Sequence, residues 1–343
     1  MDLEKRIDSY ITLIDYWLQT TESEKEKLLL FSDVRNIVSV IMDNYLTNDI
    51  PESFVECLES DTPISPNLYD YASSLFWKNY RSMYETNADI CDLTYQLPSK
   101  RKFQPLISKW YSFNKALDIV QLFFRQYDKD IYDYFLFLRK NNFIYRTNLS
   151  DDSSHGITLG LSVSEDSFVA INRFTCDINL LATIAHEVIH SYIFHIAHNL
   201  SYDEVCRMKI NSLSEVYSYF IELALADYLQ DIWGENRDIK IIKNAHFNCL
   251  VCSLKNFKAS FDRFNLVLPD YNTSSYIFDE TLAYGLLLSY HYFDSYLEDR
   301  EKTKDNILNL VVDSKDYDKR FLLNNYGISE IDLPDPWVIR KHL

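Results

Sequence analysis

The sequence predicts a mainly helical fold with one small β-sheet, and three observations support this prediction. Glycine is scarce, with 5 glycines in 343 residues, whereas extensive sheets and barrels need glycine at their tight turns. Most of the chain repeats its apolar residues at the spacing of amphipathic helices. The hydrophobic fraction of 47%, with 26 tyrosines and 21 phenylalanines, excludes a disordered chain.

The N-terminal part of the chain is predicted to be helical. Residues 1–48 show the spacing of a helical pair, a loop rich in proline follows at 49–68, and another helix is expected at 69–88. The signal is weakest at 87–105, where threonine, proline and a basic run occur together. We therefore predict a helical N-terminal lobe or layer at 1–104 and a second domain at 105–343.

The second domain begins with helices and then changes its pattern. Short alternating or apolar runs interrupt the helical period and predict a small antiparallel sheet of three strands. After them, Asp177 is predicted to cap a helix that starts at Ile178 and ends near residue 198. The predicted helices before the sheet are 112–125 and 130–140, the strands are 143–145, 157–163 and 167–172, and the later helices are 201–232, 240–262, 275–300 and 303–313.

Charge and composition exclude several classes of partner. The net charge of −17 repels phosphate backbones and anionic lipids, so we expect neither nucleic acid nor a membrane as partner. No apolar stretch approaches the length of a membrane helix, and the six cysteines are scattered, which favours a cytoplasmic location. Cys249 and Cys252 form a lone C-x-x-C, for which structural thiols are the expected role.

The sequence HEVIH at 186–190 is a candidate metal-binding and catalytic motif. Because residues i and i+4 share a helix face, His186 and His190 can offer two imidazole nitrogens to one cation, and zinc suits such a pair. Glu187 lies beside them and can take a proton from a water molecule as a general base. The pattern has a structural alternative, in which the histidines only line a core helix.

A catalytic zinc ion needs a third protein ligand. His195 and His198 do not have the spacing of known third histidines, so we expect structural or surface roles for them. Glu215, 25 residues after His190, begins the next strongly helical segment and shares a helix face with Ser218 and Glu222. Acidic side chains on the inner side of an apolar helix need a partner, and a metal is the natural one.

Several ordered motifs resemble the oligoendopeptidase F and thimet-oligopeptidase-like zinc metallopeptidases. The segment from Glu215 onward resembles their second zinc helix, residues 168–172 resemble their strand before the zinc helix, and residues 281–292 resemble their tyrosine-rich closing helix. The resemblance covers roughly residues 105–300 and implies a zincin-like helical metallopeptidase catalytic domain, with the small sheet beside the HExxH helix. Ile189 departs from the family, which usually has glycine there.

The resemblance also implies roles for individual residues. His186, His190 and Glu215 would hold one Zn²⁺ per chain, and Glu187 would be the general base for peptide hydrolysis. Stabilisation of the oxyanion is expected from Tyr284, Tyr290 or His291. Asn172, Ser218 and Glu222 are the candidates for residues that orient the metal ligands. The expected partner is a peptide or unfolded polypeptide substrate.

Two other functions remain open at this stage. The chain is shorter than members of that family, so it could be a helical binding protein derived from such peptidases, with an idle metal site. It could also be a zinc protease of effector type that cleaves one specific protein. Metal analysis and cleavage assays separate these alternatives.

Overall fold

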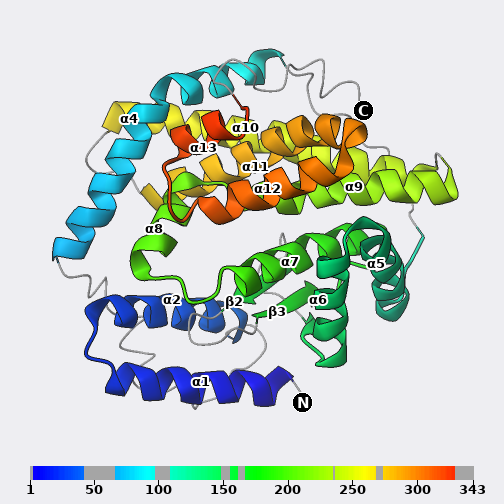
Figure 1. Cartoon of the computed structure of the whole chain (residues 1–343), viewed down its shortest axis with the longest axis horizontal. Coiled ribbons are helices and arrows are strands. Elements are labelled where there is room, and N and C mark those ends of the chain that lie inside the picture. The colour runs from blue at the N-terminus through cyan, green and yellow to red at the C-terminus, as the bar shows by residue number, and fades with distance from the viewer. Residues whose placement is uncertain are drawn as a thin grey trace. The chain divides into compact units, whose positions relative to one another are not determined.

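The computed structural model describes residues 3–41, 66–96, 109–147, 155–160, 167–234, 236–267 and 273–328, which form mostly helices and one small sheet. The chain divides into two compact units (Figure 1). Unit 1 comprises Met1–Tyr71 and Trp110–Asp203, and unit 2 comprises Ala72–Lys109 and Glu204–Leu343. The first two helices fall in unit 1, and the next helix falls in unit 2 from Ala72 onward. The domains at 1–104 and 105–343 stay a prediction.

Unit 1 contains one small sheet, the helix α7 (Asn179–Ile196) that packs on it, and two further pairs of helices. The predicted pair at 1–48 is confirmed for the described residues as α1 (Leu3–Thr20) and α2 (Glu24–Ile41). Tyr10 of α1 stacks on Phe168 of the sheet, with ring centroids 5.8 Å apart. The second pair is α5 (Phe113–Tyr127) and α6 (Lys129–Lys140), whose caps Ser112 and Asp128 accept hydrogen bonds from the first turns.

The sheet has three strands, as predicted, but it is mixed rather than antiparallel. Its order is β1 (Ile144–Thr147), β3 (Ser167–Asn172), β2 (Gly156–Gly160). β2 pairs with β3 antiparallel, whereas β1 pairs with β3 in parallel. The antiparallel prediction is therefore wrong for β1. Residues 148–166 give the chain enough length to cross over between two parallel strands, and β2 lies within that connection. Residues 161–163 of the predicted second strand lie outside the described residues.

Helix α7 (Asn179–Ile196) packs on β2 and β3, so the predicted place of the sheet beside the HExxH helix is confirmed. Its N-cap is Ile178 and not Asp177, whose Oδ1 accepts a hydrogen bond from the backbone N–H of Asn179. A buried hydroxyl cluster joins α6, β3 and α7. In it, Ser191 Oγ lies 2.8 Å from the Tyr134 hydroxyl and 2.6 Å from Ser167 Oγ.

Unit 2 is helical throughout its described residues, and α11 contacts α9, α10 and α12. The helix predicted at 69–88 extends further at both ends as α4. Asn87 within it is buried and donates to Tyr276 and Glu280. The helices are α4 (Pro66–Gln96, from Ala72 in unit 2), α8 (Tyr202–Asn211), α9 (Glu215–Trp233), α10 (Arg237–Val267), α11 (Thr273–Glu298), α12 (Arg300–Asp313) and α13 (Lys319–Asn325).

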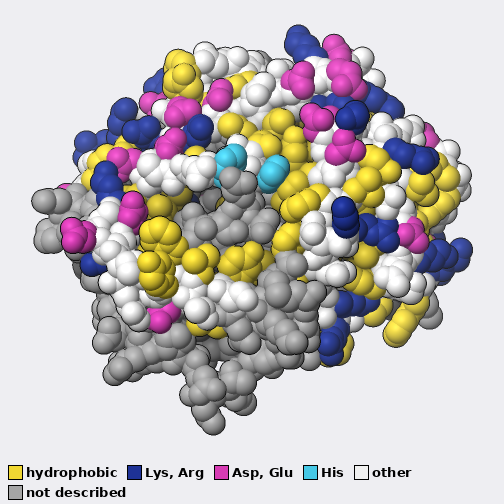
Figure 2. All heavy atoms as spheres, turned by 60° about the horizontal axis from the view of Figure 1, so that its bottom comes forward, with side chains coloured by type: hydrophobic (Ala, Val, Ile, Leu, Met, Phe, Trp, Pro, Cys, Tyr) yellow, Lys and Arg dark blue, Asp and Glu magenta, His cyan; other side chains and the backbone are white. Residues whose placement is uncertain are grey.

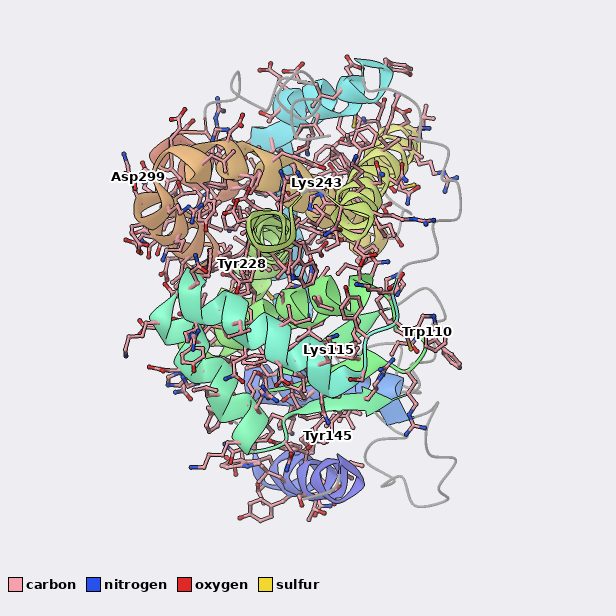
Figure 3. All side chains as sticks on the ribbon, turned by 90° about the vertical axis from the view of Figure 1, so that its right-hand side faces the viewer. Trp110, Lys115, Tyr145, Tyr228, Lys243 and Asp299 are labelled. Carbon is pink, nitrogen blue, oxygen red and sulfur yellow. The ribbon has the colours of Figure 1, made fainter. Side chains whose placement is uncertain are left out.

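On the face drawn in Figure 2, acidic and basic side chains are interspersed and form no single charged patch. In unit 1, Trp110 points outward (Figure 3) and is 84% exposed. Single exposed hydrophobic side chains of this kind are normal in globular proteins. Within the described residues, no helix combines the length and apolar character that crossing a membrane requires.

Candidate metal centre

Helix α7 brings the imidazoles of His186 and His190 together within unit 1. Their Nε2 atoms lie 3.2 Å apart. The rings are inclined by 66°, with centroids 4.9 Å apart. Both side chains are half-buried. Since residues i and i+4 lie one above the other on a helix, the local spacing alone produces this convergence.

The separation of the two nitrogens fits two ligands of one zinc ion. Zinc–nitrogen bonds of about 2.0–2.1 Å that meet at a tetrahedral angle place the two nitrogens about 3.3 Å apart. The observed separation is 3.2 Å. Imidazole nitrogen is also among the ligand atoms that zinc prefers. The pair therefore meets the requirements of two positions in a zinc site.

Glu187 follows His186 in α7, but its side chain is only 7% exposed. Thr158 of β2 supports it: its Oγ1 lies 2.7 Å from Oε2 of Glu187 and 2.7 Å from the main-chain oxygen of the same residue. Within the described part of the chain, no cation forms an ion pair with this carboxylate. Glu187 is thus a shielded carboxylate whose side-chain support comes from a neutral hydroxyl.

Gly156 lets β2 approach α7 at this point. A Cβ atom on Gly156 would lie 2.8 Å from Cγ of Glu187 and 2.7 Å from Cγ2 of Thr183. These distances are below normal van der Waals contact, so a larger residue would push the strand away from the helix. Sequence reasoning missed Thr158. Alternation at 157–163 predicted a strand, but nothing in the sequence marked which residue faces Glu187.

The remaining predicted residues of unit 1 have local partners. Asn172 ends β3, and its Oδ1 accepts a hydrogen bond from the backbone N–H of Phe174, which shapes the turn after the strand. Its role in orienting the imidazoles stays a prediction. His195 stacks on Tyr134 with centroids 4.7 Å apart, and His198 is exposed. These surroundings agree with the structural and surface roles expected for His195 and His198.

In unit 2, Glu215 is the first residue of α9, and Ser218 supports it from the next turn. The Ser218 hydroxyl lies 3.1 Å from Oε2 of Glu215 and is fully buried. A carboxylate in the first turn also interacts favourably with the positive end of the helix dipole. Gly285 of α11 packs against this residue, since a Cβ there would lie 2.5 Å from Cβ of Glu215.

Glu222 is half-buried and lies two turns after Glu215 on the same face of α9. Its charge affects the pKa of the Cys249 thiol. Burial, followed by the nearby charge of Glu222, raises the pKa of Cys249 above its ordinary value. A thiol with a raised pKa is a poor nucleophile and metal ligand. The expected structural role for Cys249 therefore agrees with its surroundings. The role of Glu222 in orienting the metal ligands stays a prediction.

The three predicted oxyanion donors differ in accessibility. Tyr284 is fully buried and donates its hydroxyl to Oδ1 of Asn87 at 2.7 Å, within unit 2. Tyr290 is 1% exposed, with its ring 5.0 Å from that of His246. His291 is half-buried. Burial and the bond to Asn87 favour a packing role for Tyr284, whereas His291 keeps contact with solvent.

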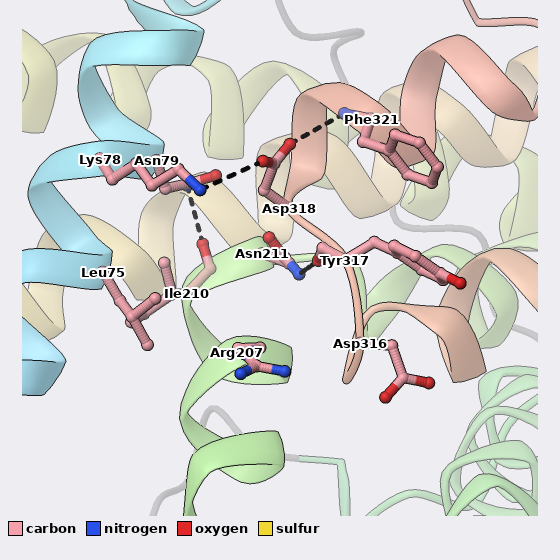
Figure 4. Close-up of a pocket in the computed structure, with 10 residues that line it drawn as sticks. All are labelled: Leu75, Lys78, Asn79, Arg207, Ile210, Asn211, Asp316, Tyr317, Asp318 and Phe321. Atoms are coloured by element: carbon pink, nitrogen blue, oxygen red, sulfur yellow. Dashed lines mark hydrogen bonds and ion pairs between the residues drawn. The ribbon is translucent and has the colours of Figure 1, made fainter.

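Unit 2 also contains a pocket of about 370 Å³ (Figure 4). Asp318 pairs with Lys78 across it at 3.7 Å, and Asn211 donates to the main-chain oxygen of Tyr317. No predicted ligand or catalytic residue lines this pocket. Its lining residues are Leu75, Lys78, Asn79, Arg207, Ile210, Asn211, Asp316, Tyr317, Asp318 and Phe321.

Known proteins resemble this chain in structure but not in sequence. No family model matches, and no curated protein is similar in sequence. The chain is similar to a "putative peptidase from Chlamydophila abortus" (TM-score 0.49, 13% identity, 98% of this chain and 62% of that one). It is also similar to a "putative oligoendopeptidase F from Bacillus anthracis str. Ames" (TM-score 0.46, 9% identity, 94% and 62%). The chain thus spans about 62% of the length of these two proteins.

Proposed function

We propose that this protein is a zinc-dependent peptidase, with His186, His190 and Glu215 as metal ligands and Glu187 as the general base. The observation that supports it best is the pair of imidazole nitrogens at zinc-like separation, with a shielded carboxylate at the next position of the same helix. Glu215 is proposed as third ligand from its residue type, its position at the start of α9 and the family resemblance of its segment.

Each of these residues would have a separate role in peptide hydrolysis. A zinc ion held there would supply a bound water of lowered pKa and polarise the peptide carbonyl. Glu187 would accept the proton of the attacking water and return it to the leaving amine. His291 is the favoured donor for the developing oxyanion, because its side chain is more accessible than those of Tyr284 and Tyr290.

The proposed substrate is a peptide or an unfolded polypeptide. The net charge of −17 favours basic or neutral peptides over acidic ones through long-range electrostatics. This preference should weaken as salt rises, because surface charges are screened over about 10 Å at 0.1 M ionic strength.

The test compares cleavage of quenched fluorescent peptides by the wild type and Glu187→Gln. Loss of a general base should lower kcat by about 10²- to 10⁴-fold. The matched control is Glu298→Gln, which changes an exposed carboxylate of α11 with no proposed role. A chelator should abolish wild-type cleavage, and added zinc should restore it.

Metal analysis of the purified protein completes the test. Zinc near one per chain is expected in the wild type, with loss in His186→Ala and His190→Ala. Equal cleavage by wild type and Glu187→Gln, or cleavage indifferent to the chelator, would overturn the peptidase function. Zinc-free protein without activity would favour the idle binding protein, and cleavage confined to one folded protein in a panel would favour the effector type.

A further inference from the structure

Strand β2 contacts Glu187 of α7, the proposed general base, through two residues, Gly156 and Thr158. Thr158 lies within 2.7 Å of two oxygens of Glu187, one on the side chain and one on the main chain. Gly156, two residues earlier, lies against the Cγ and Oε1 side of the same residue. Residues i and i+2 face the same side of a strand. The two contacts therefore come from one face of β2.

The Thr158 hydroxyl restricts the rotamer of Glu187. A hydroxyl carries one hydrogen, so the two oxygens share it or take it in turn. Because one oxygen belongs to the α7 backbone, Oγ1 stays fixed over the helix whichever way the hydrogen points. The carboxylate oxygen bonded to it is Oε2, which leaves Oε1 as the oxygen free to exchange a proton.

Gly156 lets β2 approach Glu187 closely on the side of Oε1. A Cβ atom at Gly156 would lie 3.2 Å from Oε1 and 2.8 Å from Cγ of Glu187. A side chain there would therefore push against Glu187 and displace the carboxylate. Glycine is the residue that permits this close packing of β2 on α7.

We propose that β2 positions Glu187 for proton transfer, with Thr158 as a positioning residue that holds Oε2 and Gly156 as the residue that lets the strand pack closely on Glu187. This inference rests on the proposed function. In the reaction, Oε1 takes a proton from the attacking water and gives it to the nitrogen of the leaving amine. Oε2 is the carboxylate oxygen that faces the Thr158 hydroxyl, so Thr158 acts through Glu187 and neither gains nor loses a proton.

The first experiment compares Thr158→Val with Thr158→Ser. Valine keeps the shape and the strand preference of threonine but removes the hydroxyl. Loss of an orienting partner should lower kcat by about 10- to 100-fold, with KM changed by less than about twofold, since substrate binding is untouched. Serine keeps the hydroxyl and should restore kcat to within about threefold of wild type. Thr94→Val, which removes a hydroxyl bonded to Cys91 O in α4, is the matched control.

Bound zinc is the readout that does not depend on activity. Thr158→Val should retain the wild-type zinc content and its affinity in chelator competition, because Thr158 supports the general base and no metal ligand. Loss of zinc together with activity would overturn the positioning role in favour of a general structural one. A wild-type kcat in Thr158→Val would overturn it as well.

A double-mutant cycle with Glu187→Gln tests whether Thr158 acts through Glu187. If it does, Thr158→Val should lower the residual rate of Glu187→Gln by less than about threefold, although it lowers the wild-type rate much more. Equal losses in both backgrounds would overturn the inference while the peptidase function stands. Absence of cleavage by the zinc-loaded wild type would overturn the proposed function and, with it, the role of Thr158.

Discussion

Each of the two units buries a glutamate, and the two carboxylates have different partners. In unit 2, Glu280 is 2% exposed and has Lys319 at 2.9 Å, with Asn87 and Ser212 as hydrogen-bond donors. In unit 1, Glu187 is 7% exposed and receives the neutral hydroxyl of Thr158. A buried charge is stable when it is paired and hydrogen-bonded.

This difference separates a carboxylate paired with a buried cation from the carboxylate that we propose as general base. Glu280 is neutralised by a cation that is itself fully buried and lies 4.2 Å from the ring of Tyr284. The ion pair between Glu280 and Lys319 joins α11 to α13. Glu187 lacks such a cation among the described residues, which agrees with the general-base role that we propose for it. Burial alone would not have distinguished the two.

The largest expected effect is on the buried pair of unit 2. Lys319→Met leaves Glu280 buried without its cation, which should lower the free energy of unfolding by about 3–5 kcal/mol. Lys25→Met, which breaks the half-exposed pair with Asp203, should change it by less than about 1 kcal/mol. Denaturant unfolding measures both, and equal losses would erase the contrast between buried and surface pairs.

A second variant confirms the cause of that loss. The double variant Lys319→Met with Glu280→Leu removes both charges, and it should recover part of the stability, because an apolar pair can replace a buried ion pair at little cost. An additive loss in the double variant would show that the two residues contribute through packing and not through their charges.

Gly285→Ala should have the next largest effect. Its methyl group would lie 2.5 Å from Cβ of Glu215, so α9 and α11 must separate, at a cost of about 1–3 kcal/mol in unfolding free energy. Phe278→Ala on the same helix, at a side chain that is 62% exposed, is the control. Zinc affinity measured on Gly285→Ala tells whether the packing of α11 matters to Glu215 as the packing of β2 matters to Glu187.

As pH rises into the alkaline range, unit 2 should lose folding stability at a lower pH than unit 1. In unit 2, burial raises the pKa of Cys91 from 9.0 to about 12 and that of Tyr80 from 10.0 to about 12. In unit 1, burial raises the pKa of Tyr192 from 10.0 to about 12. The folded state keeps these protons while the unfolded state releases them, so stability falls as pH rises above the unfolded pKa values.

The onset should therefore lie near pH 9 for unit 2, where the unfolded Cys91 begins to ionise, and near pH 10 for unit 1. Limited proteolysis across this pH range, with the cuts mapped by mass spectrometry, locates the unit that opens first. Cys91→Ala should move the onset in unit 2 upward. Earlier opening of unit 1 would contradict this order.

The smallest expected effect is that of Ser218→Ala. It removes the local support of Glu215, a hydrogen bond worth about 0.5–1.5 kcal/mol. If Glu215 binds zinc, the affinity for zinc should fall by about tenfold. Activity at saturating zinc should stay close to wild type, in contrast to Thr158→Val. A large loss at saturating zinc would mean that Ser218 does more than support a ligand.

Sequence reasoning succeeded where the contact is local. The HExxH spacing places His186 and His190 together because a helix repeats its face every three to four residues, and the same rule joins Glu215 to Ser218. It failed where partners are far apart in the chain. Thr158 is 29 residues from Glu187, and Asn87 was placed in a boundary region although its amide is buried against Glu280.

The sequence by itself determined the helical class, the three short strands and the two imidazoles of α7, because periodicity and i, i+4 spacing act within one element. Only the tertiary structure decided that β1 pairs in parallel, that Lys319 neutralises Glu280 and that Thr158 supports Glu187. Partners of buried charges come from distant segments, and their choice depends on how whole elements pack. That packing gives Glu280 a buried lysine as partner and Glu187 a neutral hydroxyl.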